Sequence, residues 1–123
     1  MSYELTVTEP FVAQHFLTVP DPGPEGTLHS HSFEAIATFR GPELGEYGYL
    51  LDIDAAIAAV SAAVGGYRDE TLNDRLPGNP SCERLAAALH ADVAERVTAP
   101  AVEELELTVR EDDTATVSYT APL

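Results

Sequence analysis

Lysine is absent from this sequence, and its absence leaves the chain strongly acidic. The 123 residues include six basic residues, all of them arginine, against 21 acidic residues, for a formal net charge of −15. A surface with this charge repels nucleic acid and anionic membranes, so we expect neither as a partner. Acidity without lysine is typical of proteins from a high-salt cytoplasm, where ions screen the repulsion between like charges.

Cysteine occurs once, and long apolar runs do not occur. The single Cys82 excludes an internal disulfide. No apolar run approaches the length that spans a membrane, and Met1–Glu4 lack the basic and apolar segments of a signal peptide. We therefore expect a cytoplasmic protein. The hydrophobic content of 45% argues against disorder, and the length predicts one domain, residues 1–123, with a single modest core.

Three of the four histidines can meet at one site. Residues 27–39 alternate apolar and polar side chains, with Ile36 as the one exception, as a strand with one buried face does. His29 and His31 therefore share a face, about 6–7 Å apart. Two imidazoles at that separation can bind one metal ion if a neighbouring strand supplies a third ligand, for which His15 is the candidate. The alternative is that histidines share this spacing by chance.

The pattern of apolar residues predicts the element order ββααββ. The first strand is expected at 3–7 and, after a bulge at Pro10, at 11–19. The second strand is the histidine segment up to about Gly41, and the last two strands lie at 105–111 and 115–119. The order indicates an α+β domain in which a four-stranded antiparallel sheet carries two helices on one face. Its other face and its edges stay uncovered, which predicts that several copies join their sheets into an oligomeric β-barrel.

Two helices are expected between the second and third strands. Asp52 can cap the first helix, and the residues predicted on its apolar face are Ile53, Ile57, Val60 and Val64. The second helix is predicted to begin at Asn79-Pro80 and to bury Cys82, Leu85, Ala86, Leu89, Val93 and Val97. Cys82 on this stripe indicates a core residue rather than a nucleophile. His90 beside the stripe is expected to be partly exposed.

Glu111 continues the inward row of the third strand, after Leu107 and Val109. A carboxylate at an inward position must be paired or must bind a ligand that is rich in hydrogen-bond donors. The alternative is that the strand has ended and Glu111 faces water.

Six short motifs in the expected order resemble the 6-pyruvoyltetrahydropterin synthase and 6-carboxytetrahydropterin synthase family. They span nearly the whole chain: Phe11-Val12-Ala13-Gln14-His15, Leu28-His29-Ser30-His31-Ser32-Phe33, Gly48-Tyr49-Leu50-Leu51-Asp52-Ile53, Leu72-Asn73, Asn79-Pro80-Ser81-Cys82-Glu83, and Glu111 with Tyr119. The resemblance implies a T-fold subunit, a hexamer built as a dimer of trimers, and active sites at subunit seams. Together with the acidic composition it predicts a halophilic archaeal source.

The resemblance also implies the ligands and the substrate. It places Zn²⁺ on His15, His29 and His31, and a pterin ring on Glu111. Substrate-binding residues are further implied at the start of the second helix, at Ser81 and Glu83. The implied substrate is 7,8-dihydroneopterin triphosphate, a small molecule that loses triphosphate or has its side chain cleaved.

Two catalytic positions of the family differ in this chain. The family's cysteine, four residues before the first histidine of the pair, corresponds to Glu25, and its Asp-His pair to Arg68-Asp69. Relatives with glutamate at the cysteine position are associated with a retro-aldol cleavage that gives 6-hydroxymethyl-dihydropterin. Glu25 is therefore the predicted general base of a zinc-dependent lyase. One alternative keeps the pyruvoyl or carboxy product with Asp69 or Glu70 as a proton relay. Another is a catalytically silent paralogue that binds zinc and pterin as a binding or assembly subunit.

Overall fold

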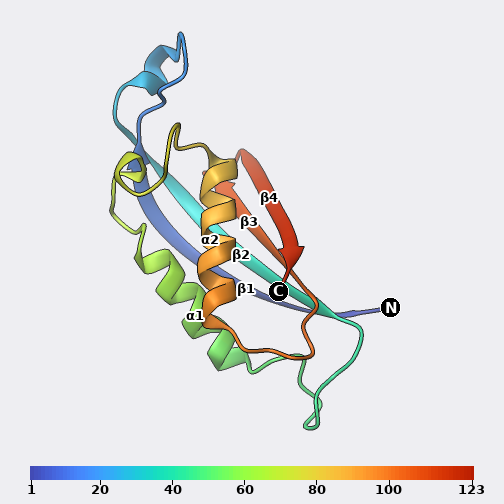
Figure 1. The fold of residues 1–123 in the computed structure, drawn as a ribbon. Coiled ribbons are helices and arrows are strands. Elements are labelled where there is room, and N and C mark those ends of the chain that lie inside the picture. The colour runs from blue at the N-terminus through green and yellow to red at the C-terminus, as the bar shows by residue number, and fades with distance from the viewer.

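A computed structural model describes residues 1–123 and confirms the predicted T-fold. One antiparallel sheet has the strand order β1 (Tyr3–His15), β2 (His29–Gly41), β3 (Glu104–Glu111) and β4 (Ala115–Pro122). The helices α1 (Ile53–Gly65) and α2 (Cys82–Arg96) lie side by side on one face of this sheet (Figure 1). Between helices and sheet lies a core of 24 buried apolar residues. No helix has both the length and the apolar character to cross a membrane.

The first strand is continuous where the sequence predicts an interruption. β1 pairs with β2 in one unbroken register from Tyr3 opposite Gly41 to His15 opposite His29, with no bulge at Pro10. The predicted interruption is wrong because β1 is an edge strand, where proline does not cost a ladder hydrogen bond.

The extended segment predicted up to residue 19 is also wrong, since β1 ends at His15. Beyond that residue the backbone bonds to other loops instead of continuing the ladder with β2. Phe16 N–H donates to the side chain of Asn73 at 3.0 Å, and Leu17 N–H donates to the carbonyl of Glu25 at 2.8 Å. These two bonds turn the chain into the 16–28 loop that connects the strands.

The first helix buries only part of the predicted face, since Val60 and Val64 are buried but the two isoleucines are not. Asp52 caps it as expected and accepts from the N–H of Asp54 at 2.9 Å. Ile53 and Ile57, however, are 59% and 46% exposed. The buried residues are Ala56, Ala59, Val60, Ala63 and Val64. Alanines on the inner face let the helix backbone lie close to the sheet, and the two isoleucines flank the contact.

The second helix begins later than predicted, at Cys82 rather than Asn79, because Ser81 is its cap and accepts from the N–H of Arg84 at 3.2 Å. The Asn79 side chain accepts from the N–H of Thr18 at 2.9 Å and so holds the 16–28 loop. Most of the predicted stripe is buried, but Cys82 and Val97 are only partly so. His90 is buried rather than partly exposed, and its Nε2 lies 3.0 Å from the Leu105 carbonyl oxygen.

Candidate metal and ligand site

Three histidines converge at the end of the sheet where β1 stops and β2 starts. His15 is the last residue of β1 and pairs directly with His29, while His31 lies one step along the same face of β2. Their ring centroids are 4.6, 4.7 and 5.2 Å apart. Each ring can offer one nitrogen so that the three nitrogens lie within 4.8 Å of one another. The structure therefore brings together all three residues predicted as metal ligands.

The Nε2 atoms of these histidines are buried and have no hydrogen-bond partner. Each Nδ1, in contrast, lies 2.8–2.9 Å from an oxygen: Pro80 carbonyl for His15, Thr27 carbonyl for His29 and Asp112 carboxylate for His31. Carbonyl and carboxylate oxygens only accept, so each Nδ1 must carry the proton and each Nε2 must present its lone pair. Burial lowers the pKa of His15, which favours the neutral ring that a metal ion needs.

Buried polar atoms without partners are costly, and three of them pointing to one place require an explanation. Neutral imidazoles backed by oxygen acceptors are the donor set of a zinc site, in which the second ring nitrogen is held by a carbonyl or carboxylate. Three protein ligands leave a fourth position for a substrate atom. The residues present therefore fit a zinc ion of the catalytic type.

Glu111 lies beside the histidines, and one of its two carboxylate oxygens accepts a hydrogen bond. Its Oε1 is 3.7 Å from Nε2 of His31, and its Oε2 accepts from Sγ of Cys82 at 2.8 Å. Burial and the neighbouring Glu111 carboxylate raise the pKa of the Cys82 thiol. The thiol therefore stays protonated and acts as a hydrogen-bond donor, not as a nucleophile.

Glu25 lies in the short 3-10 turn η1 (Gly23–Gly26), within the loop that leads into His29. Its carbonyl is fixed by Leu17, and its side chain is exposed. The charge of its carboxylate is one of the causes that raise the pKa of Cys82, so it lies on the same side of the molecule as the Cys82–Glu111 pair. Its loop thus borders the histidine site.

The start of α2 also adjoins the site, because Pro80, whose carbonyl holds His15, directly precedes the cap. Ser81 is half-buried there, and Glu83 is exposed in the first helical turn.

The structure does not bring Asp69 to the histidines. Its backbone N–H donates to the Val12 carbonyl at 2.7 Å on the outer edge of β1, and its side chain is exposed beside Arg68. Glu70, the other relay candidate, forms an ion pair of 3.0 Å with Arg75.

Asp112 is the residue of this site to which the sequence analysis gave no role. Its Oδ2 contacts His31, and its Oδ1 accepts from the N–H of Ser32 at 3.0 Å. The hydrogen bond to His31, followed by that from Ser32, lowers the pKa of the Asp112 carboxyl. The register of β3 against β2 places this residue: Phe33 pairs with Glu111, so Asp112, which directly follows β3, lies opposite Ser32.

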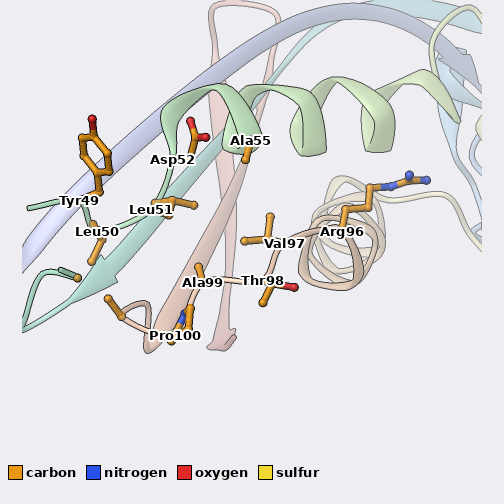
Figure 2. Close-up of a pocket in the computed structure, with 12 residues that line it drawn as sticks. Tyr49, Leu50, Leu51, Asp52, Ala55, Arg96, Val97, Thr98, Ala99 and Pro100 are labelled. Atoms are coloured by element: carbon orange, nitrogen blue, oxygen red, sulfur yellow. The ribbon is translucent and has the colours of Figure 1, made fainter. Parts of the chain in front are cut away.

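A separate hollow of about 260 Å³ lies at the far end of β2 (Figure 2). Its walls come from the segment that enters α1 and the segment that leaves α2, and Tyr49, Asp52 and Arg96 are among them. None of the predicted site residues borders it, so it is distinct from the histidine site.

Comparisons with known proteins agree with this architecture. Among solved structures, Plasmodium vivax 6-pyruvoyltetrahydropterin synthase, in a form whose catalytic glutamate is replaced by alanine, has a TM-score of 0.85 and 18% identity, covering 100% of this chain and 99% of that one. The Caenorhabditis elegans 6-pyruvoyl tetrahydropterin synthase has a TM-score of 0.81 and 13% identity, covering 98% and 96%. An uncharacterized protein of Wolinella succinogenes has a TM-score of 0.71 and 15% identity, covering 97% and 98%.

These structural matches, all at low identity, show the fold. No curated protein matches the sequence at a significant level. The profile of the family described as 6-pyruvoyl tetrahydropterin synthase, however, matches residues 4–122. That match covers nearly the whole chain, and the chain belongs to the 6-pyruvoyl tetrahydropterin synthase family.

Proposed function

We propose that this protein is a zinc-dependent lyase that acts on a 7,8-dihydroneopterin phosphate. The observation that carries the proposal is the set of three buried, unpartnered Nε2 atoms, each held in place by an oxygen on its Nδ1. Family membership supports a lyase of pterin metabolism. His15, His29 and His31 would hold the zinc ion, which when bound supplies a Lewis acid for oxygens of the substrate side chain.

Glu111 is the proposed anchor of the pterin ring. A pterin presents adjacent N–H donors, and an ionised carboxylate accepts such a pair in a charge-assisted, two-point contact. Cys82 donates to Oε2 of this carboxylate and keeps it oriented. The entrance of α2, with Ser81 and Glu83, would contribute further polar groups around the ring.

Glu25 is the proposed general base. A carboxylate in the loop beside the site can take a proton from a substrate hydroxyl. In a retro-aldol step that hydroxyl oxygen becomes a carbonyl as the adjacent carbon–carbon bond breaks, and the side-chain fragment leaves as an aldehyde. The electron pair of the broken bond enters the dihydropterin ring system, and reprotonation there gives 6-hydroxymethyl-dihydropterin. The Plasmodium vivax relative has a catalytic glutamate, which supports a carboxylate in this role. The protonated thiol of Cys82 supports it as well, since the chain's only cysteine is unsuited to nucleophilic attack.

A closed homo-oligomer, in the form of a hexamer, is part of the proposal. The sheet face away from the helices is uncovered (Figure 1), and β4 is an edge strand that pairs with β3 on one side only. Asp69 lies on the outer edge of β1, where a neighbouring copy could bring it to a second site. The alternative relay through Asp69 or Glu70 therefore requires the assembled protein.

Turnover decides between a lyase and a silent binding subunit. Zinc-loaded protein is incubated in molar salt with 7,8-dihydroneopterin and, separately, with its triphosphate, and the pterin products are identified by mass spectrometry. We expect about one zinc per chain and 6-hydroxymethyl-dihydropterin as a product, and a His31→Ala variant should lose both. Tight pterin binding without any product would replace the lyase by the silent subunit. Full zinc occupancy in His31→Ala would show that the ligand set is wrong.

A further inference from the structure

We propose that Asp112 is a positioning residue that holds His31 in the Nδ1–H tautomer and thereby sets the affinity of the three-histidine site for a divalent metal ion. The inference rests on the metal site of the proposed function and adds a residue that the sequence motifs do not include.

Asp112 is fixed against β2 by three hydrogen bonds. Its backbone N–H donates to the Ser32 carbonyl at 2.7 Å, and the Ser32 N–H donates back to Oδ1 at 3.0 Å. Oδ2 then accepts from Nδ1 of His31 at 2.8 Å. The backbone of Asp112 has φ of 50°, a left-handed conformation that aspartate adopts more readily than most residues. Both carboxylate oxygens are therefore committed, and the side chain cannot swing away without losing a contact.

The three ligand histidines differ in what holds them. The acceptors for His15 and His29 are the backbone carbonyls of Pro80 and Thr27, which no substitution removes. His31 depends on a side chain, and that side chain is 81 positions away in the sequence. Asp112 is thus the one place at which a single substitution can change the tautomer of a ligand while keeping all three histidines.

Asparagine at this position would reverse the hydrogen-bond polarity. If its Oδ1 keeps the Ser32 N–H, its amide group places a donor against Nδ1 of His31. If the amide flips, the donor meets the Ser32 N–H instead. The first arrangement drives His31 to the Nε2–H tautomer, whose proton points to the position of the metal ion. The second leaves two donors facing each other in the strand pair. The opposed donors disfavour the second arrangement, which would keep the Nδ1–H tautomer, so the first arrangement prevails and weakens metal binding.

The test measures zinc affinity by competition with a chromogenic chelator in molar salt. We expect Asp112→Asn to bind zinc about 10- to 100-fold more weakly than the wild type, the usual effect of losing such an outer contact. Asp113→Asn is the matched control. It removes the same charge from the next residue along the chain, whose side chain is 98% exposed. Its affinity should stay within about twofold of the wild type.

Two outcomes would overturn the inference. Equal zinc affinity in Asp112→Asn and the wild type would leave Asp112 without this role, and equal losses in Asp112→Asn and Asp113→Asn would reduce its effect to net charge. A second measurement needs no variant: nitrogen-15 NMR of the metal-free wild type should show His31 protonated on Nδ1, and protonation on Nε2 would contradict the mechanism. Failure of the wild type to bind zinc would instead overturn the proposed function.

Discussion

At the scale of single residues, Glu25 and Glu111 have different proposed roles: Glu25 is an exposed carboxylate, and Glu111 is held by a hydrogen bond from Cys82. Glu25 lies on a turn with its side chain open to solvent, whereas both oxygens of Glu111 have neighbours. A base must reach a proton and then release it, which an accessible side chain on a loop permits. An anchor must keep one orientation, which the thiol of Cys82 helps to impose. The two residues therefore predict different kinetic phenotypes.

Glu25→Gln should abolish the base and spare the binding site. We expect turnover to fall by about 10²–10⁴, the usual effect of removing a positioned base, while zinc content and pterin affinity stay close to wild type. Steady-state kinetics and zinc analysis measure the two effects. Glu46→Gln, which removes the same charge from the loop after β2, serves as the control. Wild-type turnover in Glu25→Gln would deprive Glu25 of its role and favour a binding module.

Glu111→Gln should weaken pterin binding while the fold and the zinc content persist. Glutamine replaces a charged acceptor by a neutral amide, one half of which is a donor that faces the N–H groups of the ring. The expected loss is about 2–4 kcal/mol in binding free energy, measured by calorimetry. The exposed Glu103 provides a control by the same substitution. Unchanged affinity in Glu111→Gln would place the ring elsewhere.

At the scale of elements, the orientation of α1 shows how a pattern can indicate a helix without choosing its buried face. Apolar residues surround this helix on most sides, because alanines fill the positions between Ile53, Ile57 and Val60. Periodicity therefore predicts the helix correctly but leaves its rotation undecided. Contact with the sheet selects the alanine face, since small side chains permit a close approach.

The rotation of α1 can be tested by comparing two truncations to alanine. Val60 is fully buried, so Val60→Ala should lower the free energy of unfolding by about 2 kcal/mol. Ile57 is 46% exposed, so Ile57→Ala should cost less than about 1 kcal/mol although it removes more atoms. Urea denaturation in molar salt measures both variants. A larger loss in Ile57→Ala than in Val60→Ala would mean that the helix is rotated toward its isoleucines.

At the scale of the whole molecule, the main feature is the excess of negative charge, a formal net charge of −15. On the sheet face away from the helices, Arg40 is surrounded by the carboxylates of Glu4, Glu104 and Glu106 at 2.7, 3.2 and 2.5 Å. These three contacts raise the pKa of Arg40, yet one positive charge cannot balance three negative ones. Joining sheets from several copies would bring such clusters together, so assembly depends on screening by salt.

We therefore expect a closed oligomer in molar salt that dissociates on dilution into low salt. At about 1 M salt the Debye length is about 3 Å, compared with about 30 Å at 0.01 M, so repulsion between subunits grows as salt is removed. Light scattering coupled to gel filtration measures the mass at each concentration. Replacing salt by an uncharged osmolyte provides the control, and it should not restore the oligomer. A monomer at every salt concentration would remove the proposed assembly.

The sequence by itself determined the features that depend on local order along the chain. Strand alternation places His29 and His31 on one face, and the order of the segments predicts ββααββ; both agree with the structure. The resemblance to the synthase family followed from the same local motifs, and the family profile confirms it. Local patterns succeed here because side-chain direction in a strand has a period of two residues whatever the strand packs against.

Tertiary structure decided the features that depend on a neighbour distant in the sequence. Pro10 fits within β1 because that strand lies at the sheet edge, and Cys82 contacts Glu111 because α2 packs on β3. Asp112 reaches His31 only through the register of β3 against β2. A single sequence shows which side chains each segment offers but not which segment will lie opposite, since that choice follows from packing of the whole core.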